Sequence, residues 1–109
     1  MNTETVNQIA ELLAKSIPQP PSDGHPYVLG QWYAIRTLTM IQTGKLEAVY
    51  DKELVLSRAA WIADTGRWAQ FCENPKNANE VEPFVASVII SRQNIIDATI
   101  IVEFLPFQK

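Results

Sequence analysis

The chain has 109 residues, a formal net charge of −3 and a sequence pI near 5.0. This length predicts one domain with one core and little room for a second module. The acidic balance excludes a sequence-wide attraction for phosphate backbones, so nucleic-acid binding would need a local basic cluster. Cys72 is the only cysteine, which excludes an intramolecular disulfide, and the first residues lack the pattern of a signal peptide or membrane span. We expect a cytoplasmic protein that does not bind membranes.

The first 17 residues have the pattern of an amphipathic helix. Thr5 and Gln8 resemble a capping box, and Pro18 ends the helical spacing of apolar residues. The polar side has no excess of positive charge, so we expect the apolar stripe to pack on its own domain rather than on a membrane. Residues 18–27 are rich in proline and form the predicted linker. The stripe consists of Val6, Ile9, Leu12, Leu13 and Ile17.

Alternating runs after the linker predict three strands. We expect the first to begin near Val28, and its residues 31–41 are apolar on both faces, which is typical of a well-covered strand. Residues 42–44 (Gln-Thr-Gly) form the expected turn into a second strand over 45–50. Residues 51–53 (Asp-Lys-Glu) turn the chain again, and a third strand is expected over 54–62.

The C-terminal half combines an insertion with two further strands. Within residues 64–83, Trp68, Phe71 and Cys72 are spaced for one face of a short helix, which Pro75 should end. Residues 85–96 and 98–104 are expected strands, with a turn around 94–97 and a stop at Pro106. The sequence therefore predicts a mainly β fold: an N-terminal helix and a strongly bent five-stranded antiparallel sheet over residues 28–105, interrupted by the insertion.

Two short motifs in this order resemble those of the Sm-like (LSm/Hfq-like) family. The first has a glycine, a leucine, an aromatic-aspartate pair and spaced aliphatic residues, and the second is the run Ile90-Ser91-Arg92-Gln93-Asn94-Ile95. In the second motif the arginine is displaced by one position and the family glycine is absent, and Val55 stands where the first motif commonly has a base-contacting asparagine. Residues 61–67 are also similar to small phage proteins. The first motif comprises Leu38, Met40, Gly44, Leu46, Tyr50, Asp51, Leu54 and Leu56.

The resemblance implies an SH3-type open barrel that assembles into a homo-oligomeric ring of about five to eight subunits. Neighbouring subunits would pair through residues 87–90 and 99–104, because uncovered strand edges favour pairing with another chain. A glycine at position 44 would permit the sharp bend of the second strand. Such a ring repeats each basic side chain around a central pore, so an acidic monomer can still present a basic opening.

Single-stranded RNA is the partner that this resemblance implies for the pore. Arg92, Gln93 and Asn94 would face it, with Lys52 nearby, because guanidinium and amide groups stack on bases and bond their edges. Glu53 would add a repulsive ring of charge. A ring that serves only as a homo-oligomeric scaffold, in a phage-related setting, is the alternative. The residues 92–94 would then form only a polar turn, and Asp51 is expected to bond backbone amides of a turn rather than to do chemistry.

A third hypothesis concerns the Asp64-Thr65-Gly66 sequence after an apolar strand, which resembles the catalytic loop of retroviral-type aspartic proteases. Arg67 stands where those enzymes have a small residue, and the simpler interpretation makes Asp64 the N-cap of the following helix. We expect no enzyme activity. The single His25 and the single cysteine predict no metal and no cofactor. In so short a chain, large aromatic side chains more often lie in the core or in a subunit interface than in a base-stacking platform. We expect the same of Trp32, Trp61 and Trp68.

Overall fold

The computed structural model describes residues 24–109, and the predicted helix over residues 1–17 lies outside the described residues together with most of the predicted linker. The described part is an antiparallel sheet of six strands with one α-helix and two short 3-10 helices. The strands are β1 (Trp32–Thr37), β2 (Ile41–Val49), β3 (Glu53–Asp64), β4 (Glu80–Pro83), β5 (Val88–Ser91) and β6 (Ile95–Ile101). The helices are α2 (Trp68–Glu73), η1 (Pro75–Asn77) and η2 (Arg92–Asn94).

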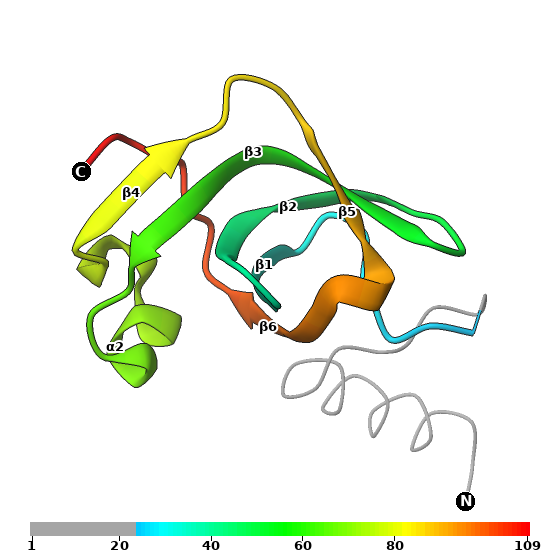
Figure 1. Cartoon of the computed structure of the whole chain (residues 1–109), viewed down its shortest axis with the longest axis horizontal. Helices are drawn as coiled ribbons and strands as arrows, with labels where there is room; N and C mark the ends of the chain where they lie inside the picture. The colour runs from blue at the N-terminus through cyan, green and yellow to red at the C-terminus, as the bar shows by residue number, and fades with distance from the viewer. Residues whose placement is uncertain (1–23) are drawn as a thin grey trace, which may run out of the picture.

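The long strand β3 organises the sheet (Figure 1). The strand order is β4-β3-β2-β1-β6, and β5 also pairs with β3. β5 pairs with the first residues of β3, Glu53 to Leu56, whereas β4 pairs with its last residues, Ala60 to Asp64. The mainly β prediction is confirmed. The count of five strands is wrong, because Glu80–Pro83 of the predicted insertion joins the sheet as β4.

The first hairpin turns earlier than the sequence predicted. Strand β1 begins at Trp32 rather than near Val28 and ends at Thr37, so Leu38 lies at the hairpin tip and is 71 % exposed. The hydroxyl of Thr37 accepts hydrogen bonds from the amides of Thr39 and Met40 and contacts the Met40 carbonyl, which stabilises this turn. The predicted turn at residues 42–44 is therefore wrong, since these residues lie inside β2.

Gly44 permits a close approach between β2 and β3. A Cβ atom at this position would lie 2.8 Å from Leu56 Cβ and 3.2 Å from the Ser57 carbonyl oxygen. The register between the strands shifts here, because Thr43 pairs with Ala60 while Lys45 already pairs with Ser57. Such an irregularity is typical of a bulge, and the bending role expected of Gly44 stays a prediction.

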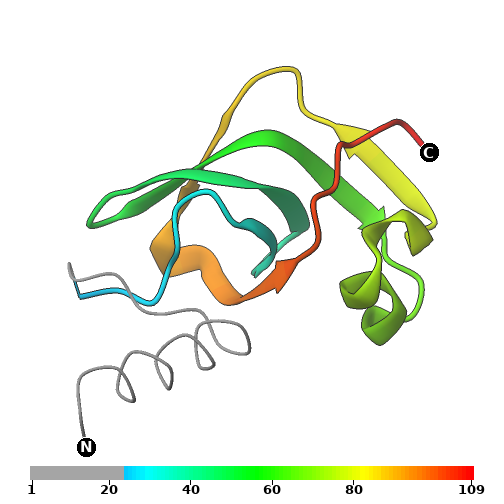
Figure 2. The ribbon, with the colours of Figure 1, turned by 180° about the vertical axis from the view of Figure 1, so that it is seen from behind.

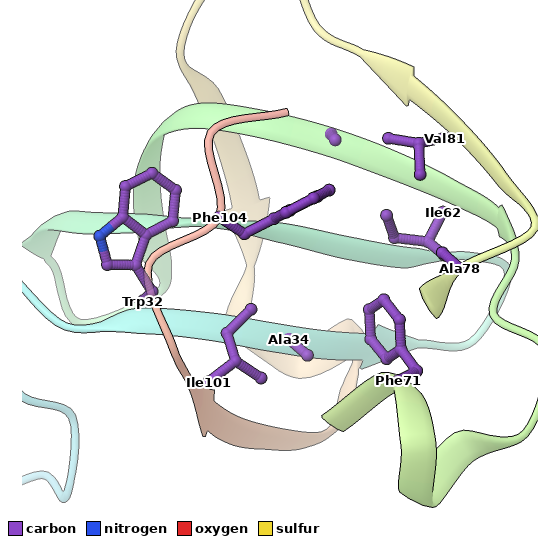
Figure 3. Packing of buried hydrophobic residues seen from close by; sticks show 9 residues of the cluster. Trp32, Ala34, Ile62, Phe71, Ala78, Val81, Ile101 and Phe104 are labelled. Carbon is purple, nitrogen blue, oxygen red and sulfur yellow. The ribbon is translucent and has the colours of Figure 1, made fainter. Parts of the chain in front are cut away.

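The two faces of the sheet are covered by different clusters of apolar side chains, so both faces of β1 are buried as predicted. We name the first the helix-side core; it holds Phe71 of α2 against β1, β3, β4 and β6 (Figure 3). We name the second the motif core. The helix-side core contains Trp32, Ala34, Ala60, Ile62, Phe71, Ala78, Val81, Ile101 and Phe104. The motif core contains Tyr33, Ile35, Leu46, Leu54, Leu56, Ala59 and Ile90.

The last part of the chain differs from the predicted pair of strands. β5 and β6 are separated by η2 at Arg92–Asn94, and β6 already begins at Ile95, where a turn was expected. β6 ends at Ile101 rather than Phe104, and the chain then crosses to β4, where the amide and carbonyl of Lys109 bond those of Val81 (Figure 2). Phe104 is only 1 % exposed, so this tail completes the helix-side core.

The predicted short helix is confirmed as α2, and it ends at Glu73 before Asn74 and Pro75. Pro75 begins η1, since its missing N–H costs nothing at the first position of a helix. Phe71 is fully buried, and its ring stacks on Trp68 with centroids 5.4 Å apart. The insertion is therefore a structural part of the domain that closes the helix-side core.

Candidate functional site

Two loops that the Sm-like resemblance had placed near each other do meet in the structure. We name them together the loop pair: residues 50–52 between β2 and β3, and residues 92–94, which form η2. The backbone amide of Arg92 donates to the Lys52 carbonyl at 2.9 Å. Its Nη1 atom donates to the carbonyls of Tyr50 at 2.8 Å and Asp51 at 3.2 Å. Arg92 therefore fastens the two loops together.

Arg92 also contacts the chain that enters the domain. Its guanidinium carbon lies 5.5 Å from the centroid of the Tyr27 ring, within the range of a cation–π interaction. Tyr27 in turn lies edge-on to Tyr33, whose hydroxyl accepts a hydrogen bond from the Val28 amide at 3.0 Å. Burial raises the pKa of the Tyr33 phenol above its ordinary value.

A cleft of about 350 Å³ opens beside the loop pair. Its walls contain one basic side chain, Arg92, and one acidic side chain, Asp51. The two charges offset each other, so the cleft does not present a uniformly basic wall. The lining residues are Gly24, His25, Val49, Tyr50, Asp51 and Arg92.

The four predicted RNA-binding residues therefore differ in availability. Lys52, Gln93 and Asn94 are exposed on the loop pair. Arg92 is half-buried, and one arm of its guanidinium is engaged with carbonyl oxygens. Asn94 also accepts a backbone hydrogen bond from Leu38 at 3.1 Å, so η2 is fixed against the first hairpin. Sequence alone could not reveal the bonds of Arg92, because its partners lie about forty residues earlier in the chain.

The residues of the first motif divide into a buried and an exposed group. Leu46, Leu54 and Leu56 have no exposed surface and fill the motif core. Tyr50 and Asp51 are exposed in the turn that follows β2. The spacing that resembles the Sm-like motif thus serves the core and the turn of the hairpin.

Strands β5 and β6 each have one edge that pairs with no other strand of residues 24–109. β5 carries no charged residue, and β6 carries only Asp97. Ile89 of β5 is 70 % exposed and Ile96 of β6 is 63 % exposed. Proteins usually protect such edges with charges, prolines or a covering segment. Neither strand contains a proline, and Asp97 is the only charged residue in the two strands.

A second polar cluster, which the sequence did not predict, joins β1, β6 and α2. Arg36 and Asp97 pair across the two strands and form a two-armed ion pair, with Arg36 Nε donating to Asp97 Oδ1 at 2.8 Å. The Arg36 guanidinium carbon lies 4.5 Å from the Trp68 ring centroid. The hydrogen bond from Arg36 lowers the pKa of Asp97, while burial raises that of the nearby Cys72 thiol. This cluster attaches α2 to the sheet and neutralises the only charge of β6.

Asp64 lies in an exposed turn at the end of β3. Its Oδ1 atom accepts a hydrogen bond from the Gly66 amide at 2.8 Å, while Arg67 is the N-cap of α2. The predicted N-cap role of Asp64 is therefore wrong by three residues. A bond to an amide two residues later is the ordinary local bond of a turn aspartate. The protease hypothesis stays a prediction.

The three tryptophans have different environments. Trp32 is 8 % exposed in the helix-side core, and Trp68 packs against that core. Trp61 is 40 % exposed on β3. The core interpretation therefore holds for Trp32 and Trp68, which are not available as a stacking platform.

Residues 24–109 lack two kinds of feature. They contain no group of three His, Cys, Asp or Glu side chains arranged to hold a metal ion. None of their helices is long and apolar enough to cross a membrane.

Comparisons with protein-family models, with curated proteins and with solved structures return no match for this chain.

Proposed function

We propose that this protein is an Sm-like homo-oligomeric scaffold whose subunits pair through the uncovered edges of β5 and β6. The observation that carries the proposal is the character of these edges: both are unpaired within the described chain, and both are nearly free of charge. Unpaired N–H and C=O groups along such edges favour addition of a strand from another chain. Two different edges generate a head-to-tail contact, which closes into a ring when the rotation between subunits allows it.

The order of elements supports the same proposal. β5, η2 and β6 follow one another directly, so the two edges lie at either side of a short connection. The ion pair of Arg36 with Asp97 removes the one charge that would oppose strand addition at β6. The Sm-like resemblance supplies the expected size of about five to eight subunits.

The decisive experiment is a measurement of mass in solution by light scattering. We expect about five to eight times the 12.3 kDa mass of the chain. Replacement of the exposed β6 residue by a cation, Ile96→Lys, should reduce the mass to that of the monomer while the thermal unfolding transition persists. Leu29→Lys is the matched control, because Leu29 is 59 % exposed but lies outside every strand. A monomeric wild-type protein would refute the proposal.

Binding of single-stranded RNA is a second candidate, and the observation that favours it is the loop pair. Arg92 binds the two loops together, so Lys52, Gln93 and Asn94 are presented on a fixed surface. Repetition of this surface in an oligomer would raise the local density of positive charge. The offsetting Asp51 in the adjacent cleft is the reason that we place this function second.

Fluorescence anisotropy with a short labelled oligonucleotide tests this second candidate. Lys52→Gln should weaken binding and lower its salt dependence, because one phosphate contact per subunit is lost. Lys76→Gln serves as the control, since Lys76 lies on η1, in the insertion rather than on the loop pair. If neither added salt nor Lys52→Gln changes the affinity for the oligonucleotide, the loop pair is not the RNA-binding surface. Arg92→Ala is the less specific change, because it also releases the two loops.

A further inference from the structure

An apolar groove on the outer side of β3 and β5 is not explained by the proposed assembly. It has a volume of about 340 Å³ and is lined by Tyr50, Glu53, Val55 and Ile89. Val55 and Ile89 are direct partners across the two strands, so their side chains stand on the same face. Tyr50 is 59 % exposed and Ile89 is 70 % exposed. We name this surface the Tyr50 groove.

The segment of the chain that precedes the described residues reaches the domain next to this groove. Gly24, the first described residue, lines the cleft of the loop pair together with Tyr50. Tyr50 also lines the Tyr50 groove, so the two depressions are neighbours. Residues 18–23 separate Gly24 from the apolar stripe of residues 6–17, and six residues span at most roughly 20 Å. The stripe is therefore tethered within reach of the groove.

The chemistry of the stripe fits the chemistry of the groove. The sequence of residues 6–17 places five apolar side chains at helical spacing, and a segment with such a stripe needs an apolar surface to cover it. Three of the four groove residues offer that surface, and the fourth, Glu53, offers a carboxylate to the ammonium group of Lys15. A helix laid in a groove by its apolar face is a common mode of recognition within and between chains.

We propose that the apolar stripe of residues 6–17 docks in the Tyr50 groove of its own chain. The tether makes this contact intramolecular, so its effective concentration is in the millimolar range and a modest apolar contact suffices to hold it. The contact does not depend on the pairing of β5 and β6, because it uses the outer face of β3 and β5 rather than a strand edge.

Disulfide trapping in a Cys72→Ser background tests the proposal. The pair Leu13→Cys with Ile89→Cys should form a cross-link within one chain, at least about tenfold faster than a control pair. Glu11→Cys with Ile89→Cys is the matched control, since Glu11 lies on the polar side of the same segment and at a similar distance from the linker. The product should keep the mass of one chain under denaturing conditions, and its rate should not change on dilution.

Three results would overturn the proposal. Equal rates for the two pairs would mean that the apolar face has no preference for the groove. Cross-links mainly between chains, with a rate that rises with protein concentration, would assign the groove to a second copy. No cross-link in either pair would mean that residues 6–17 do not occupy the Tyr50 groove. The cross-linking pair is also made in the Ile96→Lys background, which should be a monomer. If the cross-link still forms within that monomer, docking of the segment does not depend on assembly of the subunits.

Amide hydrogen exchange gives a second and independent measure. Val55→Asp introduces a charge into the groove, so the amides of residues 6–17 should exchange several-fold faster than in the wild type. Val85→Asp is the control, because Val85 is fully exposed in the loop between β4 and β5. Unchanged exchange in Val55→Asp would contradict docking of this segment in the groove.

Discussion

The two halves of β3 belong to two different cores, although they are one continuous strand. The first half pairs with β5 and carries Leu54 and Leu56 into the motif core. The second half pairs with β4 and carries Ala60 and Ile62 into the helix-side core. The register shift opposite Gly44 separates the halves. One continuous strand therefore contributes side chains to two separate cores.

The two cores also differ in what surrounds them. The motif core lies behind the loop pair and the Tyr50 groove, where the candidate contacts with other molecules or segments are found. The helix-side core is closed by α2, by β4 and by the tail that ends at Lys109. We expect changes in the helix-side core to alter stability without altering contacts at the loop pair.

The largest predicted effect comes from removal of a fully buried side chain in either core. Phe71→Ala should lower the free energy of unfolding by about 3–5 kcal/mol, and Leu54→Ala by about 2–5 kcal/mol, because each leaves a cavity. The two residues belong to separate clusters, so the double variant should lose the sum within about 0.5 kcal/mol. Urea titrations of the four proteins measure this. A larger coupling energy would mean that the two cores act as one.

The next effect lies at the point where the halves meet. Gly44→Ala should cost about 1–3 kcal/mol, because its Cβ would lie 2.8 Å from Leu56 Cβ and must displace β3. Urea unfolding measures the loss. Gly30→Ala is the contrasting variant: nothing lies within 4 Å of its Cβ, and only the positive φ of 84° opposes the change. A loss at Gly44 no greater than that at Gly30 would show that the close approach is not limiting.

A smaller effect is expected at Arg58, opposite Gly44 in the same irregularity. Arg58 has a φ of 49°, a left-handed conformation that costs a residue with a side chain about 1–2 kcal/mol. Arg58→Gly removes this cost but loses about 0.5–1 kcal/mol to the greater freedom of glycine when unfolded. The net expectation is a gain of about 0–1.5 kcal/mol in the free energy of unfolding, measured by thermal unfolding. Arg58→Ala retains the Cβ and should show no gain.

The smallest effect concerns the ion pair that attaches α2 to the sheet. The pKa of Asp97 is lowered from its ordinary 3.8 by the hydrogen bond from Arg36. Because the charged form is favoured in the folded state, the stabilisation is present above pH 3.8 and is lost as the pH falls through the lower folded value. Both side chains are about 40 % exposed, so solvent screens the pair and its contribution to the free energy of unfolding is small. Urea unfolding at several acidic pH values measures this loss. Asp97→Asn should weaken the dependence of the free energy of unfolding on pH in this range, and an unchanged dependence would contradict the contribution of the pair.

Local patterns in the sequence were sufficient for several elements of the fold. The apolar faces of Trp32 to Ile35 predicted a covered strand, and the spacing of Trp68 and Phe71 predicted α2. The turn around residues 51–53 was also predicted correctly. These features depend on side chains that are neighbours in the chain, so their signals are contained in short windows of sequence.

Other features required contacts between distant residues. The turn was predicted at Gly44 because glycine is common in turns, but the packing of β2 against Leu56 gives that glycine a place inside a strand. β4 was missed because its four residues form a strand only by pairing with the end of β3. The bonds of Arg92 to carbonyl groups of the opposite loop were missed, because those partners lie about forty residues earlier in the chain.

The amino-acid sequence by itself therefore determined the mainly β character, the short helix and the apolar residues that bury themselves. The tertiary structure alone decided which edges of the sheet stay unpaired, which loops meet and how the chain after β6 closes the second core. The reason is physical. Burial and local turns follow from the free energy of individual side chains, while edges and loop contacts follow from the pairing of strands that lie far apart in the chain.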